Sequence, residues 1–140
     1  MKVITVLSMF FLLFTVSSSG AGEIDQFLES RSVAGQIFFL KGSSQLSVVQ
    51  KQSLKKISQK LLKQSGNKLL VRVEGFSSPE GDESLNYKLS MQRAVQVQDF
   101  LQKQKLSTEL FLMGQGEKNA STAKLSEQRR VDIATYQETR

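Results

Sequence analysis

The 140-residue sequence contains no cysteine and no histidine. Without cysteine it forms no disulfide and offers no thiolate nucleophile, and without histidine it lacks the usual general base near neutral pH. Its carboxylates cluster in one loop, and the sequence shows neither a metal-ligand set nor a glycine-rich phosphate loop. We therefore expect no catalytic activity and no cofactor or metal.

The longest apolar run lies at the amino terminus, where Lys2 precedes Val3 to Val16 and small residues follow over 17–22. This order predicts a secretory signal over residues 1–22, removed by cleavage at its small residues. An uncleaved anchor is the alternative, but the run is shorter than the roughly 20 residues that a membrane-spanning helix needs. We therefore expect a periplasmic protein that has no membrane span after cleavage, and the lack of cysteine rules out a lipid-bearing thiol.

Lysine and arginine total 19 against 13 acidic residues, a formal net charge of +6. Such an excess is compatible with a nucleic-acid partner or an anionic surface. Several of the lysines, however, recur along one amphipathic helix and are interpreted as its solvated face. They are Lys51, Lys55, Lys56, Lys60 and Lys63. Export argues further against nucleic acid as a partner.

The remaining chain predicts one domain over 36–136, preceded by a short lead over 23–35. Alternating apolar residues predict strands at 68–74 and 131–134, and short β-type runs predict two more at 36–39 and 109–113. Apolar residues three or four apart predict helices at 47–63 and 82–104. Ser43 and Ser44 are candidate caps of the first helix, and Gly66 is its expected end. The sole proline, Pro79, lacks an N–H donor and predicts a turn, whereas the polar stretch 117–129 carries no predicted element.

The second predicted helix carries a charge on an otherwise apolar side. Asn86, Leu89, Arg93, Val97 and Phe100 are three or four residues apart and so share that side. A partly buried guanidinium must be paired or hydrogen-bonded, because desolvating it alone costs several kcal/mol. Its forked geometry suits a ligand carboxylate held at two points. A local glutamate, or water reached by methylenes that lie over the core, remain alternative partners.

Between Val73 and Leu101 the residues Gly75, Gly81, Asn86, Leu89, Ser90, Arg93 and Ala94 occur in a distinctive order. This order resembles the central motif of the OmpA C-terminal family, in which a Gly-His-Thr-Asp turn is followed by Gly, Asn, Leu-Ser and Arg-Ala. Phe76, Ser77 and Ser78 occupy the His-Thr-Asp positions, so this chain is a variant that lacks the motif Asp.

Other landmarks agree with the same family. Ile37, Phe39, Ser43 and Leu46 are similar to its opening strand and turn, 114–117 resembles its Gly-x-Gly-Glu turn, and 128–131 resembles the Asn-Arg-Arg-Val start of its last strand. The resemblance covers about residues 36–135. It implies an α+β fold, a β-α-β-α-β sandwich whose helices pack on one mixed sheet, which the alternation of strands and helices also favours.

The family binds the peptide stems of peptidoglycan, and the resemblance implies the same here. The implied ligand-binding residues are Ser77, Ser78, Asn86, Leu89, Arg93 and Arg129. Members that bind diaminopimelate-type stems hold the ammonium of that residue with the motif Asp and its carboxylate with the motif Arg. Arg93 retains the second half of this arrangement, whereas Ser78 offers a neutral hydroxyl. Glu80, Asp82 and Glu83 are candidate replacements for the missing acid.

The resemblance therefore leaves two expectations for function. The first is a non-catalytic periplasmic module, associated with the outer membrane or cell wall, that binds peptidoglycan through Arg93 and the preceding turn. The alternative is a degenerate module that keeps the fold but contacts another envelope protein and binds no peptidoglycan. Arg93 favours the first expectation, and the serine at position 78 favours the second.

Overall fold

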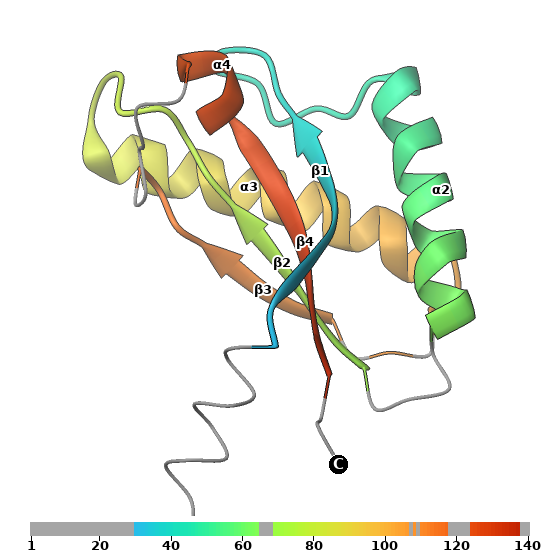
Figure 1. Cartoon of the computed structure of the whole chain (residues 1–140). Helices are drawn as coiled ribbons and strands as arrows, with labels where there is room; N and C mark the ends of the chain where they lie inside the picture. Colours follow the sequence, from blue (N-terminus) through green and yellow to red (C-terminus); the bar gives the residue numbers. More distant parts are fainter. Residues whose placement is uncertain (1–29, 65–68, 107, 109, 118–123, 138–140) are drawn as a thin grey trace, which may run out of the picture.

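The computed structural model describes residues 30–64, 69–106, 108, 110–117 and 124–137 (Figure 1). In chain order its elements are β1 (Ser32–Phe38), α2 (Val48–Gln64), β2 (Leu69–Gly75), α3 (Glu83–Lys103), β3 (Leu110–Gly114), α4 (Leu125–Gln128) and β4 (Arg130–Gln137). The predicted signal over 1–22, the first part of the predicted lead and Gly66 lie outside the described residues. No helix in the described part of the chain is long and apolar enough to cross a membrane.

The strands form one mixed sheet in the order β1-β4-β2-β3. The last strand, β4, lies between β1 and β2 and is antiparallel to both, whereas β3 is parallel to β2. Both long helices, α2 and α3, lie on the same side of this sheet (Figure 1). The prediction of an α+β domain with helices packed on one mixed sheet is therefore confirmed.

The core lies between the sheet and the two long helices. Because side chains alternate along a strand, β2 directs Leu69, Val71 and Val73 to the helices, and Val71 and Val73 are fully buried. Burial of each such side chain contributes about 1.5–3 kcal/mol. The helices complete the core with Leu54, Leu61, Ala94, Val97 and Leu101, and β4 with Val131 and Ile133.

Side-chain caps define where the long helices begin. The backbone N–H of Gln50 donates to Ser47 Oγ (3.3 Å), and the Gln50 side chain accepts from the Ser47 N–H (2.6 Å), which is the reciprocal pattern of a capping box. Ser43 and Ser44 therefore do not cap α2, and this prediction is wrong because both lie too far before its first turn. Asp82 Oδ1 accepts from the Leu85 N–H (3.0 Å), so Asp82 is the cap of α3 rather than its first residue.

Two strands extend beyond their predicted bounds, and one helix was not predicted. β1 begins at Ser32, inside the predicted lead, because it pairs with β4 as far as the Ser32–Thr135 register. β4 reaches Gln137 because β2 pairs with it along its whole length. The helix α4 lies in the stretch predicted to carry no element, since a four-residue helix is too short to show an apolar period.

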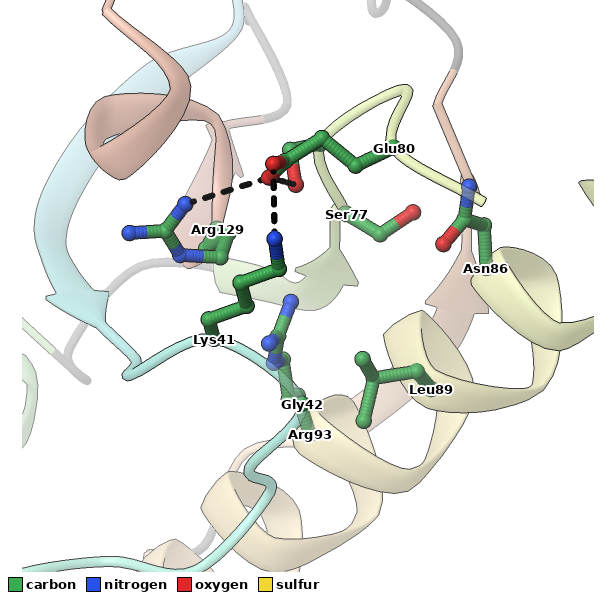
Figure 2. A pocket seen from close by; sticks show the side chains of 9 residues that line it. Lys41, Gly42, Ser77, Glu80, Asn86, Leu89, Arg93 and Arg129 are labelled. Atoms are coloured by element: carbon green, nitrogen blue, oxygen red, sulfur yellow. Dashed lines mark hydrogen bonds and ion pairs between the residues drawn. The ribbon is translucent and has the colours of Figure 1, made fainter. Parts of the chain in front are cut away.

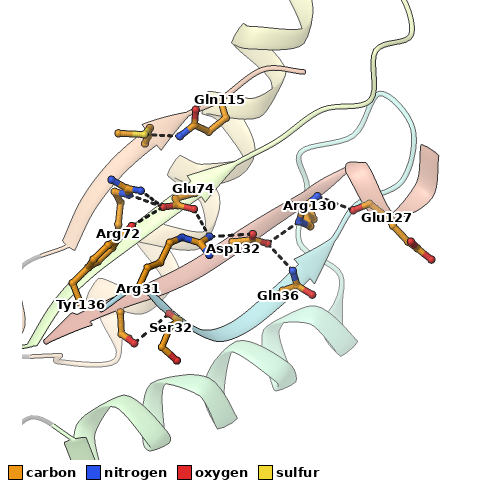
Figure 3. Close-up of polar contacts among 12 residues, drawn as sticks. Arg31, Ser32, Gln36, Arg72, Glu74, Gln115, Glu127, Arg130, Asp132 and Tyr136 are labelled. Carbon is orange, nitrogen blue, oxygen red and sulfur yellow. Dashed lines mark hydrogen bonds and ion pairs between the residues drawn. The ribbon is translucent and has the colours of Figure 1, made fainter. Parts of the chain in front are cut away.

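The sheet face opposite the helices carries a charged layer (Figure 3). Glu74 accepts hydrogen bonds from Arg31 (2.7 Å), Arg72 (2.5 Å) and the hydroxyl of Tyr136 (3.3 Å), although it is only 2% exposed. Burial alone raises the pKa of Glu74, but the hydrogen bonds from Arg31 and Arg72 outweigh it and the pKa is lowered. The carboxylate of Glu74 therefore stays ionised within this layer.

Asp132 forms the second centre of the charged layer. Arg130 (2.8 Å) and the amide of Gln36 (3.0 Å) both donate to its Oδ1, and Arg31 lies 3.5 Å from its Oδ2 (Figure 3). Arg31 therefore links the two buried carboxylates of β2 and β4. The layer is internally paired, so it holds the open face of the sheet together.

Candidate ligand-binding pocket

A pocket of about 150 Å³ lies where the loops after β1 and β2 meet α3 and the residue that follows α4 (Figure 2). Its lining residues are Lys41, Gly42, Ser77, Ser78, Glu80, Asn86, Leu89, Arg93 and Arg129. All six residues predicted from the sequence to bind ligand are among them. The prediction missed Lys41 and Gly42, which carry no motif, and considered Glu80 only as a replacement acid.

Close packing between β2 and α3 positions the loop that carries the serines. A Cβ added at Gly75 would lie 1.9 Å from the backbone oxygen of Ser90, so only glycine fits at the end of β2. The Ser90 hydroxyl accepts from the N–H of Gly116 (2.9 Å) and donates to the Tyr87 carbonyl (2.7 Å). Ser77 N–H in turn donates to the Gly116 carbonyl (2.7 Å). The serine loop is thus fixed against the helix by the close packing at Gly75 and by hydrogen bonds that run through Gly116 to the Ser90 hydroxyl.

Arg93 forms the floor of the pocket and is fully buried. Its guanidinium donates to the backbone carbonyls of Ser43 (2.8 Å), Phe76 (3.0 Å) and Leu40 (3.2 Å), and lies 5.4 Å from the centre of the Phe39 ring. The prediction that this guanidinium is hydrogen-bonded is therefore confirmed. Among the described residues its partners are not a glutamate but carbonyls from the two loops that border the pocket.

The charge of Arg93 has no counter-ion among the described residues, since none of their carboxylates forms an ion pair with it. Burial, together with the nearby charge of Arg129, lowers the pKa of the Arg93 guanidinium to about 10, so it stays protonated at neutral pH. A guanidinium has five N–H groups, of which three donate to carbonyls. Arg93 is thus a buried cation with spare donors at the pocket wall.

Glu80 is the acid that approaches Ser78. Lys41 Nζ lies 2.9 Å from its Oε1, and its Oε2 accepts from the Ser78 hydroxyl (3.0 Å) and lies 3.6 Å from Arg129. The hydrogen bonds from Lys41 and Ser78 lower the pKa of Glu80. Of the three acids considered as replacements, Glu80 lines the pocket, whereas Asp82 caps α3.

The rest of the wall consists of three neutral side chains and Arg129. The Ser77 hydroxyl is buried and has no hydrogen-bond partner among the described residues, and in Figure 2 it points to the side where Asn86 lies. The amide of Asn86 donates to Glu117 (3.2 Å), and Leu89 supplies an apolar surface. Arg129 Nε contacts the Phe39 carbonyl only at 3.4 Å. The pocket therefore combines neutral donors with more positive than negative charge, an arrangement that suits an anion.

Within the described ranges, no group of three or more acidic residues is placed to hold a metal ion, and the sequence contains no histidine or cysteine. The cationic side chains that line the pocket are of the kind that forms charge-assisted hydrogen bonds with carboxylates.

The element order, the mixed sheet and the helices on its one face define an OmpA-like domain. The OmpA family model matches residues 38–133, and the chain belongs to the OmpA family. No curated protein matches the chain.

Several solved structures share this fold. A C-terminal domain of MotB from Helicobacter pylori is 17% identical, with a TM-score of 0.64, over 75% of this chain and 87% of that chain. The peptidoglycan-associated lipoprotein from Burkholderia pseudomallei is 19% identical, with a TM-score of 0.56, over 71% and 88%. An outer membrane protein from Borrelia burgdorferi B31 is 20% identical, with a TM-score of 0.57, over 75% and 86%. At these identities the likeness concerns the fold.

Proposed function

We propose that this protein is a non-catalytic periplasmic module that associates with peptidoglycan by binding a stem-peptide carboxylate in the pocket. The observation that carries the proposal is Arg93, a fully buried cation without a counter-ion among the described residues. Burying a charge costs free energy unless the charge is paired. An anionic ligand that pairs with Arg93 would therefore be bound favourably.

The pocket supplies a plausible set of contacts for one carboxylate. The two N–H groups of Arg93 that do not donate to carbonyls are available for its oxygens, and Arg129 adds a second charge from the other wall. The hydroxyl of Ser77 has no partner in the part of the chain that the structure describes, so it can donate to the ligand. Leu89 and Asn86 then line the space beside the bound group.

Family membership supports the ligand and the compartment. The chain belongs to the OmpA family, and one protein of the same fold is named a peptidoglycan-associated lipoprotein. The predicted signal over 1–22 agrees with a periplasmic location at the outer membrane or cell wall, and the lack of histidine and cysteine agrees with a binding role.

The alternative is a structural module that contacts another envelope protein and no longer binds the stem peptide. Ser78 favours this alternative, because it stands where the family motif has an acid and offers only a hydroxyl, which donates to Glu80. Glu80 itself contacts Lys41 and Arg129, so no pocket acid stands ready to hold a ligand ammonium.

Co-sedimentation of the secreted protein with purified sacculi tests the proposal. Arg129→Gln is the informative variant, because Arg129 has weak internal contacts whereas Arg93 also holds the loops. Lys60→Gln is the matched control, since it removes the same charge from the exposed side of α2, away from the pocket. Nonspecific attraction of a cationic protein would fall equally in both variants.

We expect the wild type and Lys60→Gln to sediment with sacculi. Arg129→Gln should bind about tenfold more weakly, because it loses one charge-assisted contact. Competition by a soluble stem peptide would identify the ligand. If the wild type does not sediment, or if both variants lose binding equally, the stem-binding proposal is wrong and the structural module is favoured.

A further inference from the structure

The charges around the pocket are unbalanced in a way that affects which ligand it selects. Three cationic side chains, Lys41, Arg93 and Arg129, line it together with one acid, Glu80. Both oxygens of Glu80 are already engaged, Oε1 by Lys41 and Oε2 by Ser78 and Arg129. An anion entering the pocket therefore meets uncompensated positive charge, whereas a cation meets an acid that is already neutralised.

Lys41 makes the contact that a ligand ammonium would need. Its Nζ lies 2.9 Å from Glu80 Oε1, and Figure 2 shows the two side chains meeting above Arg93. A zwitterionic ligand has to displace this ammonium to reach Glu80, so it exchanges one ion pair for another and gains little. Its own ammonium also lies in the field of Arg93 and Arg129.

The neutral wall of the pocket provides an independent indication. Ser77 Oγ is buried and none of the described residues hydrogen-bonds to it, and a hydroxyl both donates and accepts. Such a hydroxyl can hydrogen-bond to an uncharged amide of a ligand without bringing two like charges together. Leaving it unpaired carries a desolvation penalty that a ligand amide removes.

We infer that the pocket selects a carboxylate whose neighbouring nitrogen is acylated and uncharged, in preference to a free amino-acid zwitterion, and that Lys41 sets this preference. The inference rests on the proposed function, because it specifies the part of the stem that the same pocket takes. Lys41 neutralises Glu80, Arg93 and Arg129 receive the carboxylate, and Ser77 contacts the neutral nitrogen or its acyl oxygen.

A matched pair of small ligands tests this selectivity. Free diaminopimelate carries two carboxylates and two ammonium groups, and its N,N′-diacetyl derivative keeps the carboxylates but carries no ammonium. Dissociation constants for both are measured by NMR titration of the wild type, of Lys41→Met and of Lys60→Met. Lys60 is exposed on α2 and lines no part of the pocket, so Lys60→Met controls for the loss of one positive charge.

We expect the wild type to bind the diacetyl form at least about threefold more tightly, with a ratio that shrinks as salt screens the charges. In Lys41→Met, Glu80 is released for a ligand ammonium, so the ratio should fall to about one or reverse. Lys60→Met should keep the wild-type ratio. The extra bulk of the acetyl groups is the same for all three proteins, so the change of ratio reports on Lys41 alone.

Two results would overturn the inference. If the wild type prefers free diaminopimelate while sacculi still sediment, the pocket takes a zwitterion and only the proposed function survives. If the ratio is the same in Lys41→Met and Lys60→Met, Lys41 does not set the preference. Binding of neither ligand, together with failure to sediment sacculi, overturns the proposed function and the inference with it.

Discussion

Substitution of Arg93 tests whether this side chain holds the two loops of the pocket together. Arg93→Ala removes three hydrogen bonds to the carbonyls of Leu40, Ser43 and Phe76, and a contact with the Phe39 ring. The bond to Phe76 is the buried one, and a buried carbonyl left without a donor costs about 1–3 kcal/mol, whereas the Leu40 carbonyl keeps the N–H of Ser43 as a donor (3.1 Å). Part of that loss is offset, because the alanine variant no longer buries a charge with a lowered pKa.

The net loss should be about 3–5 kcal/mol in the free energy of unfolding, similar to the removal of one partner from a buried polar network. For domains of about 60–100 residues, 1 kcal/mol shifts the melting temperature by roughly 4–8 °C. The melting temperature of Arg93→Ala should therefore fall by more than about 12 °C, as measured by circular dichroism or calorimetry.

Two comparisons separate geometry from charge. Arg93→Lys keeps the charge, but one ammonium lacks the planar fork that spans carbonyls of both loops, so most of the loss should remain. Arg129→Ala should cost less than about 1 kcal/mol, because the Arg129 contacts are long and partly exposed. A melting temperature of Arg93→Ala within about 2 °C of the wild type would refute the argument that Arg93 holds the loops.

Three further predictions concern the sheet and the serine loop. Because Arg31 and Arg72 hold the pKa of Glu74 below its usual 4.5, the ionised form stabilises the fold above that pH, and its contribution is lost as the pH falls through the lowered value. The free energy of unfolding of Glu74→Gln should therefore change less between pH 7 and 3 than that of the wild type. The same change in both proteins would contradict this role of Glu74. Ser78→Asp should not improve ligand binding, because it places a second carboxylate beside Glu80, 3.0 Å from the present hydroxyl; a tighter complex would show that Glu80 moves aside. Gly75→Ala should lower the melting temperature strongly through its clash with Ser90, whereas Gly42→Ala, with φ of 68° but no neighbour within 4 Å, should cost only about 1 kcal/mol. Equal effects of the two glycine substitutions would exclude the clash as the cause.

The sequence predicted the positions of the helices and strands, but not how the strands pair in the sheet. The pattern of apolar residues located both long helices and all four strands, although only β2 and the helices show a regular alternation of buried and less buried positions. It did not reveal that β4 lies between β1 and β2, because pairing partners leave no mark in local periodicity. The helix α4 is too short for a period, and the start of β1 depends on its partner rather than on its own apolar residues.

The residues of the pocket were also predicted better than their contacts. The motif placed Ser77, Ser78 and Arg93 together, and the structure agrees. The partners of Arg93 could not be foreseen, because they are backbone carbonyls, which every residue carries. The role of Lys41 could not be predicted for a related reason: a lone lysine in a turn is typical of a solvated side chain. Lys41 is indeed largely exposed, and only the fold brings it to Glu80, far away in the sequence.

The central position of β4 constrains when this domain can fold. β4 pairs with both β1 and β2, so the sheet has a gap between its first two strands until the last strand arrives. A chain emerging from a ribosome or a translocation channel therefore lacks a complete core until residues near Gln137 are free. Contacts between such distant segments also slow folding. Release of the last strand is therefore the event that completes the sheet and its core.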